Sequence, residues 1–175
     1  DTAALQSAIL RANQQVLDAS AGNSSYEGMG STATVLHVDE HAGMAYYAHV
    51  GDSRLYLLRR GIFRQVSRDH SYVEELVARG ELSEAEAQHH PRKNLLLRAV
   101  GIEERLHVDG DSFPLEAGDR LLLATDGLTN MVGDDELAAI LGGEFTGLAD
   151  RMVAQALAGG GSDNITAIAL AYEMP

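Results

Sequence analysis

Four short apolar runs separated by tight turns lie between residues 32 and 66, and they constrain the fold more than any other feature of the sequence. The first two, residues 32–38 and 44–50, are rich in β-branched and aromatic side chains. Two further runs follow at residues 54–58 and 62–66. Strands joined by such short turns pair antiparallel, because parallel neighbours need a long crossover. We therefore expect an antiparallel meander in this region.

Helical and extended segments alternate around the meander. Apolar residues recur at helical spacing in residues 3–19, and Ser83 with Glu86 has the spacing of a capping box. Further helices are expected at residues 72–79, 135–141 and 148–157, and further strands at residues 106–113, 120–124 and 165–171. Without an internal repeat or a linker, this order predicts a single α+β domain over residues 1–175, with antiparallel sheets and helices packed outside.

Composition excludes several classes of partner and mechanism. The net charge is −13, with 26 acidic residues against 13 basic ones, which makes nucleic acid and anionic membranes poor partners. No apolar run is long enough to span a membrane. The chain has no cysteine, so thiolate metal sites and a cysteine nucleophile are excluded. A reducing, cytoplasmic location fits this composition.

Two motifs match known functional signatures, but the residues around them do not fit those signatures. Residues 28–33 match the dinucleotide fingerprint G-x-G-x-x-A, but they follow a loop and precede a β-type run, whereas that fingerprint opens a helix. Asp109-Gly110-Asp111 resembles the D-x-D motif of aspartyl-phosphate phosphatases. Such a site also needs a downstream lysine, and the only lysine, Lys93, lies upstream. Neither motif carries a functional assignment.

Three other segments share one design, in which an aspartate sits beside small or glycine residues where a strand meets a turn. They are Gly51-Asp52-Ser53-Arg54, Thr125-Asp126-Gly127-Leu128 and Gly161-Ser162-Asp163-Asn164. Glycine neighbours let the backbone approach an ion closely, and hard cations prefer oxygen ligands. A single such aspartate is more often a cap or an Asx turn. Three in this order favour a site for divalent cations.

The ordered set of motifs resembles the bacterial metal-dependent protein phosphatases, the PPM or type 2C family of serine/threonine phosphatases. The resemblance covers nearly the whole chain and includes, besides the three aspartate segments, the motifs at residues 28–32, 66–71, 98–101, 117–119 and 159–166. It implies an α+β fold, with a sandwich of two antiparallel β-sheets flanked by helices. It also implies that residues 70–97 correspond to the family's variable flap beside the active site.

The resemblance further implies a metal centre and an activity. Asp126 and Asp163 correspond to carboxylate ligands of a dinuclear Mn²⁺ or Mg²⁺ centre, and Asp52 to the aspartate that, with Asp126, holds a third ion in bacterial members. Asp69, in the family's Asp-His motif, is expected to be structural. The implied reaction is hydrolysis of phosphoserine or phosphothreonine in phosphorylated proteins, by a water that the ions activate, in opposition to a serine/threonine kinase.

One part of the family pattern is absent from these residues. The first metal motif, an Asp-Gly before a glycine-rich stretch, and the phosphate-binding arginine upstream of it have no counterpart. The resemblance therefore implies a phosphatase domain that lacks its front strands. We expect the chain as it stands to be inactive and the parent protein to be catalytic. The alternative is a non-catalytic phosphatase-like module that binds a partner protein.

Overall fold

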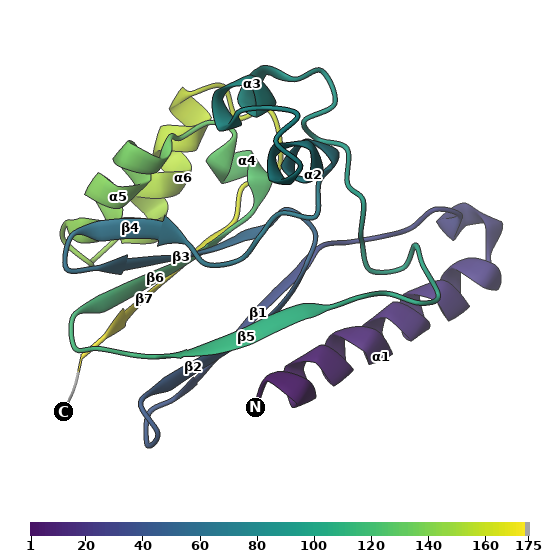
Figure 1. The fold of residues 1–175 in the computed structure, drawn as a ribbon, viewed down its shortest axis with the longest axis horizontal. Helices are drawn as coiled ribbons and strands as arrows, with labels where there is room; N and C mark the ends of the chain where they lie inside the picture. Colours follow the sequence, from purple (N-terminus) through teal and green to yellow (C-terminus); the bar gives the residue numbers. More distant parts are fainter. Residues whose placement is uncertain (174–175) are drawn as a thin grey trace. The chain divides into compact units, whose positions relative to one another are not determined.

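The computed structural model describes residues 1–173, which form two compact units that interleave along the chain (Figure 1). The first unit contains residues 1–52 and 68–113, and the second contains residues 53–67 and the chain from Pro114 onward. Each unit has its own sheet and its own helices. The two are described separately below.

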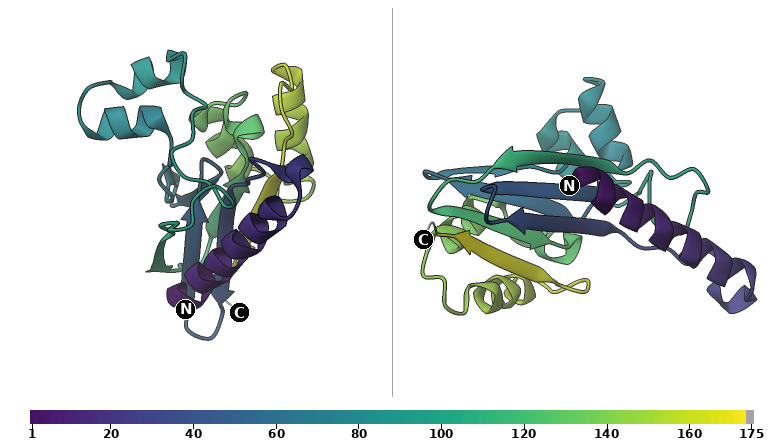
Figure 2. Two further views of the ribbon diagram at one scale, coloured as in Figure 1. Left: turned by 90° about the vertical axis from the view of Figure 1, so that its right-hand side faces the viewer. Right: turned by 90° about the horizontal axis from the view of Figure 1, so that it is seen from below.

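The first unit has a three-stranded sheet in the order β1-β2-β5. Strands β1 and β2 pair antiparallel, from Ala33 opposite Val50 to Asp39 opposite Met44. The elements of this unit are α1 (Thr2–Ala21), η1 (Ser24–Tyr26), β1 (Ala33–Asp39), β2 (Met44–Val50), α2 (Tyr72–Ala78), α3 (Glu84–His89) and β5 (Asp109–Pro114). Helix α1 lies along the sheet, and α2 and α3 lie side by side (Figures 1 and 2).

The core of the first unit forms between α1 and β2. Ile9 of α1 is buried together with Ala48 and Val50 of β2 and with three residues of the segment before β5, namely Val100, Leu106 and Val108. The periodicity of α1 predicted one apolar face, and this face packs against the sheet through Leu5, Ile9 and Val16.

The second unit has a four-stranded antiparallel sheet in the order β4-β3-β6-β7. Its strands are β3 (Arg54–Arg59), β4 (Ile62–Gln65), β6 (Asp119–Ala124) and β7 (Ala167–Tyr172), and its helices are α4 (Asp126–Thr129), α5 (Asp134–Gly142) and α6 (Leu148–Ala158). Every second residue of a strand points to the same face. Accordingly Tyr56, Leu122 and Ala124 pack against the three helices, in a core that also holds Leu128, Val132, Leu137, Leu141, Leu148, Met152 and Ala156.

The expected fold class, two antiparallel sheets with flanking helices, is confirmed. The single meander over residues 32–66 is wrong, because β2 and β3 belong to different sheets. Strand β3 already has β4 on one edge and β6 on the other, so no edge is left for β2. The expected strand at residues 106–113 begins only at Asp109, and α4 was not expected at all.

Two other expectations concern larger features of the chain. Among residues 1–173, no helix combines the length and the apolar character that a membrane span requires. The flap expected at residues 70–97 contains α2 and α3, and Ser83 and Glu86 form the expected capping box at the start of α3. The role of this segment as a flap stays a prediction, as does the grouping of the whole chain into one domain.

Candidate metal centre

The ends of β6 and β7 hold the first part of the candidate site. The two strands pair antiparallel up to Ala124 opposite Ala167. The contact continues one residue further, since the Thr125 amide donates to the Thr166 carbonyl at 3.1 Å and the Thr166 amide donates to the Thr125 hydroxyl at 2.9 Å. Asp126 then begins helix α4. The segment that contains Asp163 is thereby fixed beside the start of that helix.

Gly127 allows this close approach. A Cβ atom on Gly127 would lie 2.2 Å from the carbonyl oxygen of Asn164, a distance that no side chain can occupy. The backbone of the 163–164 turn therefore takes the place where a side chain would be. Asp126 precedes one side of this contact and Asp163 precedes the other. Two aspartates that are far apart in sequence are brought together in this way.

The carboxylates of Asp126 and Asp163 interact electrostatically. Partial burial raises the pKa of Asp126, and the negative charge of Asp163 raises it further. The Gly127 amide and the charge of Arg54 oppose this shift without cancelling it. A divalent cation would remove the repulsion between the two carboxylates, and carboxylate oxygens are ligands that Mg²⁺ and Mn²⁺ prefer. The pair therefore fits a divalent metal ion.

The pair supplies only part of a metal coordination shell. Among residues 1–173, no group of three or more acidic, histidine or cysteine side chains is arranged to hold a metal. Asp163 is exposed and Asp126 is partly buried, which leaves their oxygens accessible to further ligands. Mg²⁺ takes about six oxygen ligands and usually keeps several waters.

Asp52 lies in the first unit, two residues before the start of β3 at Arg54. It follows Gly51, whose φ of 110° is in the region that favours glycine. A Cβ on Gly51 would lie 2.4 Å from the Cγ2 atom of Thr32. Asp126 and Asp163, in contrast, are brought together within the second unit. The assignment of Asp52 to a third ion stays a prediction.

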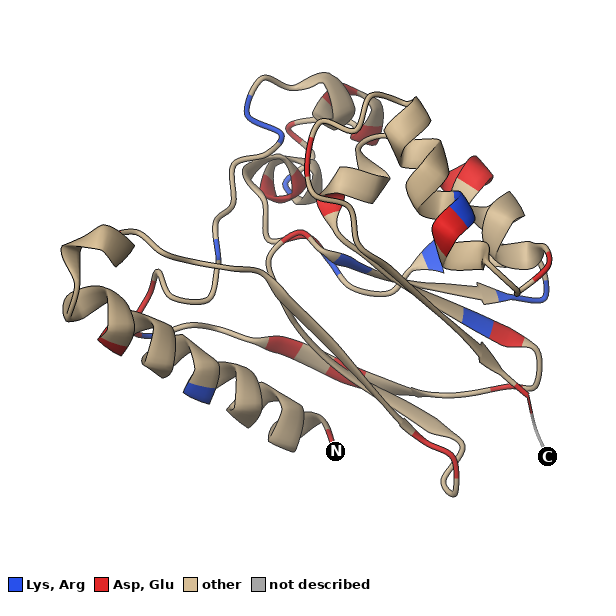
Figure 3. Cartoon of the chain, turned by 180° about the vertical axis from the view of Figure 1, so that it is seen from behind, with Lys and Arg blue, Asp and Glu red and all other residues tan. Residues whose placement is uncertain are grey.

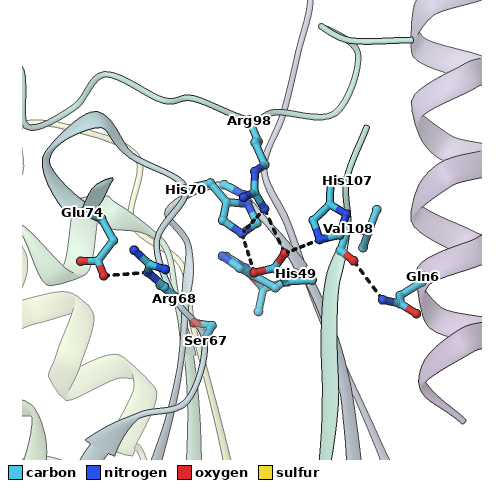
Figure 4. Close-up of polar contacts among 12 residues, drawn as sticks. Gln6, His49, Ser67, Arg68, His70, Glu74, Arg98, His107 and Val108 are labelled. Carbon is cyan, nitrogen blue, oxygen red and sulfur yellow. Dashed lines mark hydrogen bonds and ion pairs between the residues drawn. The ribbon is translucent and has the colours of Figure 1, made fainter. Parts of the chain in front are cut away.

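A cluster of polar side chains in the first unit was not predicted from the sequence. The side chains of His70, Arg98 and His107, which Figure 4 labels, each contact the carboxylate of Asp109. The distances are 3.1 Å from His70 Nε2 to Oδ2, 2.9 Å from Arg98 Nη1 to Oδ1 and 3.3 Å from His107 Nε2 to Oδ1. The ring of His49 lies 4.8 Å from that of His70. In the sequence, Asp109 appeared only in the rejected D-x-D motif. In the structure, its carboxylate is the group that these three side chains contact.

The titration of this cluster follows from burial and neighbouring charge. Burial lowers the pKa of His70, and the nearby Arg98 charge adds to this, although the hydrogen bond to Asp109 opposes it. Burial, together with His70, lowers the pKa of His49 to about 4. The pKa of Asp109 lies below its usual value although partial burial opposes this, because His70 and Arg98 stabilise the carboxylate. Near neutral pH, both histidines are therefore neutral beside an ionised aspartate.

Comparison with known proteins gives the context of these residues. The family model described as Protein phosphatase 2C matches residues 1–76, and the model described as Stage II sporulation protein E (SpoIIE) matches residues 78–173. The chain is 33% identical to the solved serine/threonine phosphatase of S. agalactiae, with a TM-score of 0.86 over 95% of this chain and 69% of the other. The chain belongs to the protein phosphatase 2C family. The expected family is thus confirmed.

A relative in sequence and two further solved structures also support membership of this family. The serine/threonine phosphatase stp of Listeria monocytogenes serotype 4b is 41% identical over 94% of this chain and 65% of its own length. Stp1 from Staphylococcus aureus is 34% identical, with a TM-score of 0.91 over 97% of this chain and 66% of that one. A structure of the catalytic domain of PstP, in complex with two manganese ions, has a TM-score of 0.86 at 32% identity. The chain thus spans about 65% of the length of the Listeria relatives it matches.

Proposed function

We propose that these residues belong to a protein phosphatase that hydrolyses phosphoserine and phosphothreonine and depends on Mn²⁺ or Mg²⁺. The observation that carries the proposal is the close approach of the 163–164 turn to the start of α4, where the charge of Asp163 helps to raise the pKa of Asp126. Bacterial serine/threonine phosphatases are the relatives at the level of both sequence and structure. One of them holds two manganese ions. Two ions, or three, are proposed here.

Within this proposal the residues of the chain bind and orient the reactants. Asp126 and Asp163 hold the cations, which when bound lower the pKa of a water and screen the charge of the phosphate. The Thr125–Thr166 contacts keep the two carboxylates in place. Asp52 is proposed to hold a further ion. The chain has no cysteine, which is consistent with water as the nucleophile.

The proposed substrates are phosphorylated proteins, since the relatives are named as serine/threonine phosphatases. A serine/threonine kinase that phosphorylates the same proteins is the proposed opposing partner. Because the chain spans about 65% of its Listeria relatives, these proposals refer to the whole protein that contains residues 1–175.

Hydrolysis of a phosphothreonine peptide tests the proposal. The whole protein is expected to release phosphate with added Mn²⁺ or Mg²⁺ and to lose activity in excess chelator. The Asp52→Asn variant is expected to turn over more slowly while two ions still bind, as measured by calorimetry. Full activity in chelator, or a covalent phosphoenzyme, would contradict the mechanism. Binding of phosphopeptides without turnover at any metal concentration would instead support a non-catalytic module.

A further inference from the structure

His70 contacts both peptide groups of Gly51. The Gly51 amide donates a hydrogen bond to Nδ1 of the His70 ring at 3.2 Å, and the His70 amide donates to the Gly51 carbonyl at 2.8 Å. Both residues are buried. His70 thus holds both peptide planes that flank the Gly51 Cα atom, and His49 also interacts with the Gly51 backbone. Because the second plane joins Gly51 to Asp52, its orientation sets the backbone position of Asp52.

The hydrogen bonds define the protonation of the His70 ring. Because Nδ1 accepts the Gly51 amide, the ring proton must be on Nε2. Nε2 faces the Asp109 carboxylate at 3.1 Å and can donate to it. Arg98, whose Nη1 atom lies 2.9 Å from the same carboxylate, keeps Asp109 ionised and oriented. The order is therefore Asp109 to His70 to the Gly51 backbone. Arg98 Nη1 also lies 3.2 Å from Nε2, but with the proton on Nε2 it donates to Asp109 and not to the ring.

The Gly51 turn has little freedom to adjust if this arrangement is lost. Its φ of 110° favours glycine, and a Cβ there would meet the side chain of Thr32, so the backbone is packed tightly against the residue before β1. An unsatisfied Gly51 amide would be buried, and a buried donor without a partner costs about 1–3 kcal/mol. The amide could regain a partner only if the turn left this tightly packed position, and Asp52 would then be displaced with it.

We propose that His70, held by Asp109, is a positioning residue that orients the carboxylate of Asp52 for its metal ion. The inference rests on the proposed function, because it takes Asp52 as a ligand of the third ion. Its specific content is that Nδ1 of His70 sets the Gly51 backbone and that Asp109 sets the ring. A histidine that merely filled space in the core would show no preference between its two ring nitrogens.

Two substitutions separate the two nitrogens. His70→Asn places an amide oxygen near the position of Nδ1, so the Gly51 amide keeps an acceptor while the donor to Asp109 is lost. His70→Gln reaches toward Asp109 with its amide but leaves the Gly51 amide without an acceptor. Both variants remove the ring and so lose similar packing. A comparison of the two at equal temperature, with the free energy of unfolding measured for each, therefore contrasts loss of the Gly51 contact with loss of the Asp109 contact.

The first measurement is spectroscopic and independent of activity. Long-range ¹H–¹⁵N correlation spectra are expected to show His70 with its proton on Nε2 near neutral pH. The backbone amide resonances of Gly51 and Asp52 are expected to shift strongly in His70→Gln and weakly in His70→Asn. A proton on Nδ1, or equal shifts in the two variants, would overturn the positioning role whether or not the protein is a phosphatase.

The second measurement is the Mn²⁺ concentration that gives half-maximal turnover. His70→Gln is expected to raise it about tenfold or more, in common with Asp52→Asn, because loss of residues that orient metal ligands weakens metal affinity about 10–100-fold. His70→Asn is expected to stay close to the unsubstituted protein. An unchanged Mn²⁺ response in His70→Gln, with Asp52→Asn impaired, would overturn the inference and leave the proposed function intact. Turnover without any metal dependence would instead contradict the proposed function.

Discussion

Partial burial and the negative charge of Asp163 raise the pKa of Asp126, and a bound cation would relieve the repulsion between the two carboxylates. Asp126→Asn or Asp163→Asn is expected to lower turnover by at least about a hundredfold, since each change removes a ligand for the cations that stabilise the transition state. Steady-state hydrolysis of a phosphothreonine peptide at saturating Mn²⁺ measures the effect.

The matched control for these changes is Asp150→Asn. Asp150 is an exposed aspartate in the first turn of α6, so its substitution removes the same charge from the same unit. It is expected to change turnover by less than about twofold, because surface substitutions away from special features are close to neutral. Equal losses in Asp150→Asn and Asp126→Asn would show that net charge, and not metal binding, controls the rate.

His49 gives the stability of the protein a specific dependence on pH. Its folded-state pKa is about 4, against 6.5 as the usual value, because the ring is buried. Between about pH 6.5 and 4 the unfolded state binds a proton that the folded state does not. Stability is therefore complete above about pH 6.5 and falls, as pH is lowered to about 4, by up to about 1.4 kcal/mol per pH unit.

Urea unfolding at pH 7, 6 and 5 measures this dependence. His49→Asn can still hydrogen-bond to the Thr34 hydroxyl, which lies 2.9 Å from Nδ1 of His49, but it does not titrate. Its stability is expected to fall less steeply with decreasing pH, whereas the exposed His37→Asn control is expected to follow the unsubstituted protein. The same slope in all three proteins would rule out His49 as the source.

Features with a local sequence signal were predicted, and contacts made only by the fold were not. Asp126 was expected directly after its strand, and Ser83 and Glu86 have a spacing that defines a helix cap. His70 and Asp109 belong to segments with no shared periodicity. Their contact depends on how the strand and the loop are folded in three dimensions. No pattern in the sequence could have identified their hydrogen bond.

At the scale of elements, β6, β7 and α4 build the carboxylate pair. The strands were predicted from their apolar runs, and Asp126 was correctly expected at the end of β6. The sheet change after β2 was missed, because alternation in a strand shows which face is buried and not which strand is its neighbour. The four-residue helix α4 is too short to show helical periodicity.

Substitution of Gly127 tests the contact between these elements. Gly127→Ala places a methyl group 2.2 Å from the Asn164 carbonyl, so the start of α4 and the 163–164 turn must move apart. We expect a loss of about 1–3 kcal/mol in the free energy of unfolding, in line with overpacking of a tight site, together with weaker Mn²⁺ binding. Denaturant unfolding and calorimetry measure the two effects.

Gly133→Ala is the control for this change. A Cβ on Gly133 meets no atom within 4 Å, and its φ of −72° suits any residue. Because Gly133 is the N-cap of α5, the substitution is expected to lower the free energy of unfolding by at most about 1 kcal/mol. It is expected to leave Mn²⁺ binding unchanged. If Gly127→Ala bound Mn²⁺ as well as Gly133→Ala does, the close backbone contact would not be needed for the carboxylate pair.

At the scale of the molecule, charge and composition restrict the reaction more than they restrict the fold. Acidic residues occur on helices and loops of both units (Figure 3), and the net charge of the chain is −13. A phosphate group approaching such a chain is repelled unless bound cations reverse the local field. The proposed dependence on divalent metal therefore has an electrostatic reason in addition to the chemical one.

A polypeptide of residues 1–175 alone is expected to bind Mn²⁺ weakly and to be essentially inactive. Asp126 and Asp163 offer two carboxylates to ions that need about six oxygens each, and residues 1–173 contain no third acidic or histidine side chain grouped with them. Water must supply the remaining ligands, and water does not hold two cations close together. Calorimetry with Mn²⁺ and a phosphothreonine peptide assay on this polypeptide measure both properties. Tight binding of two ions with rapid turnover would show that another residue here completes the site, and the assignment of its ligands would then be wrong.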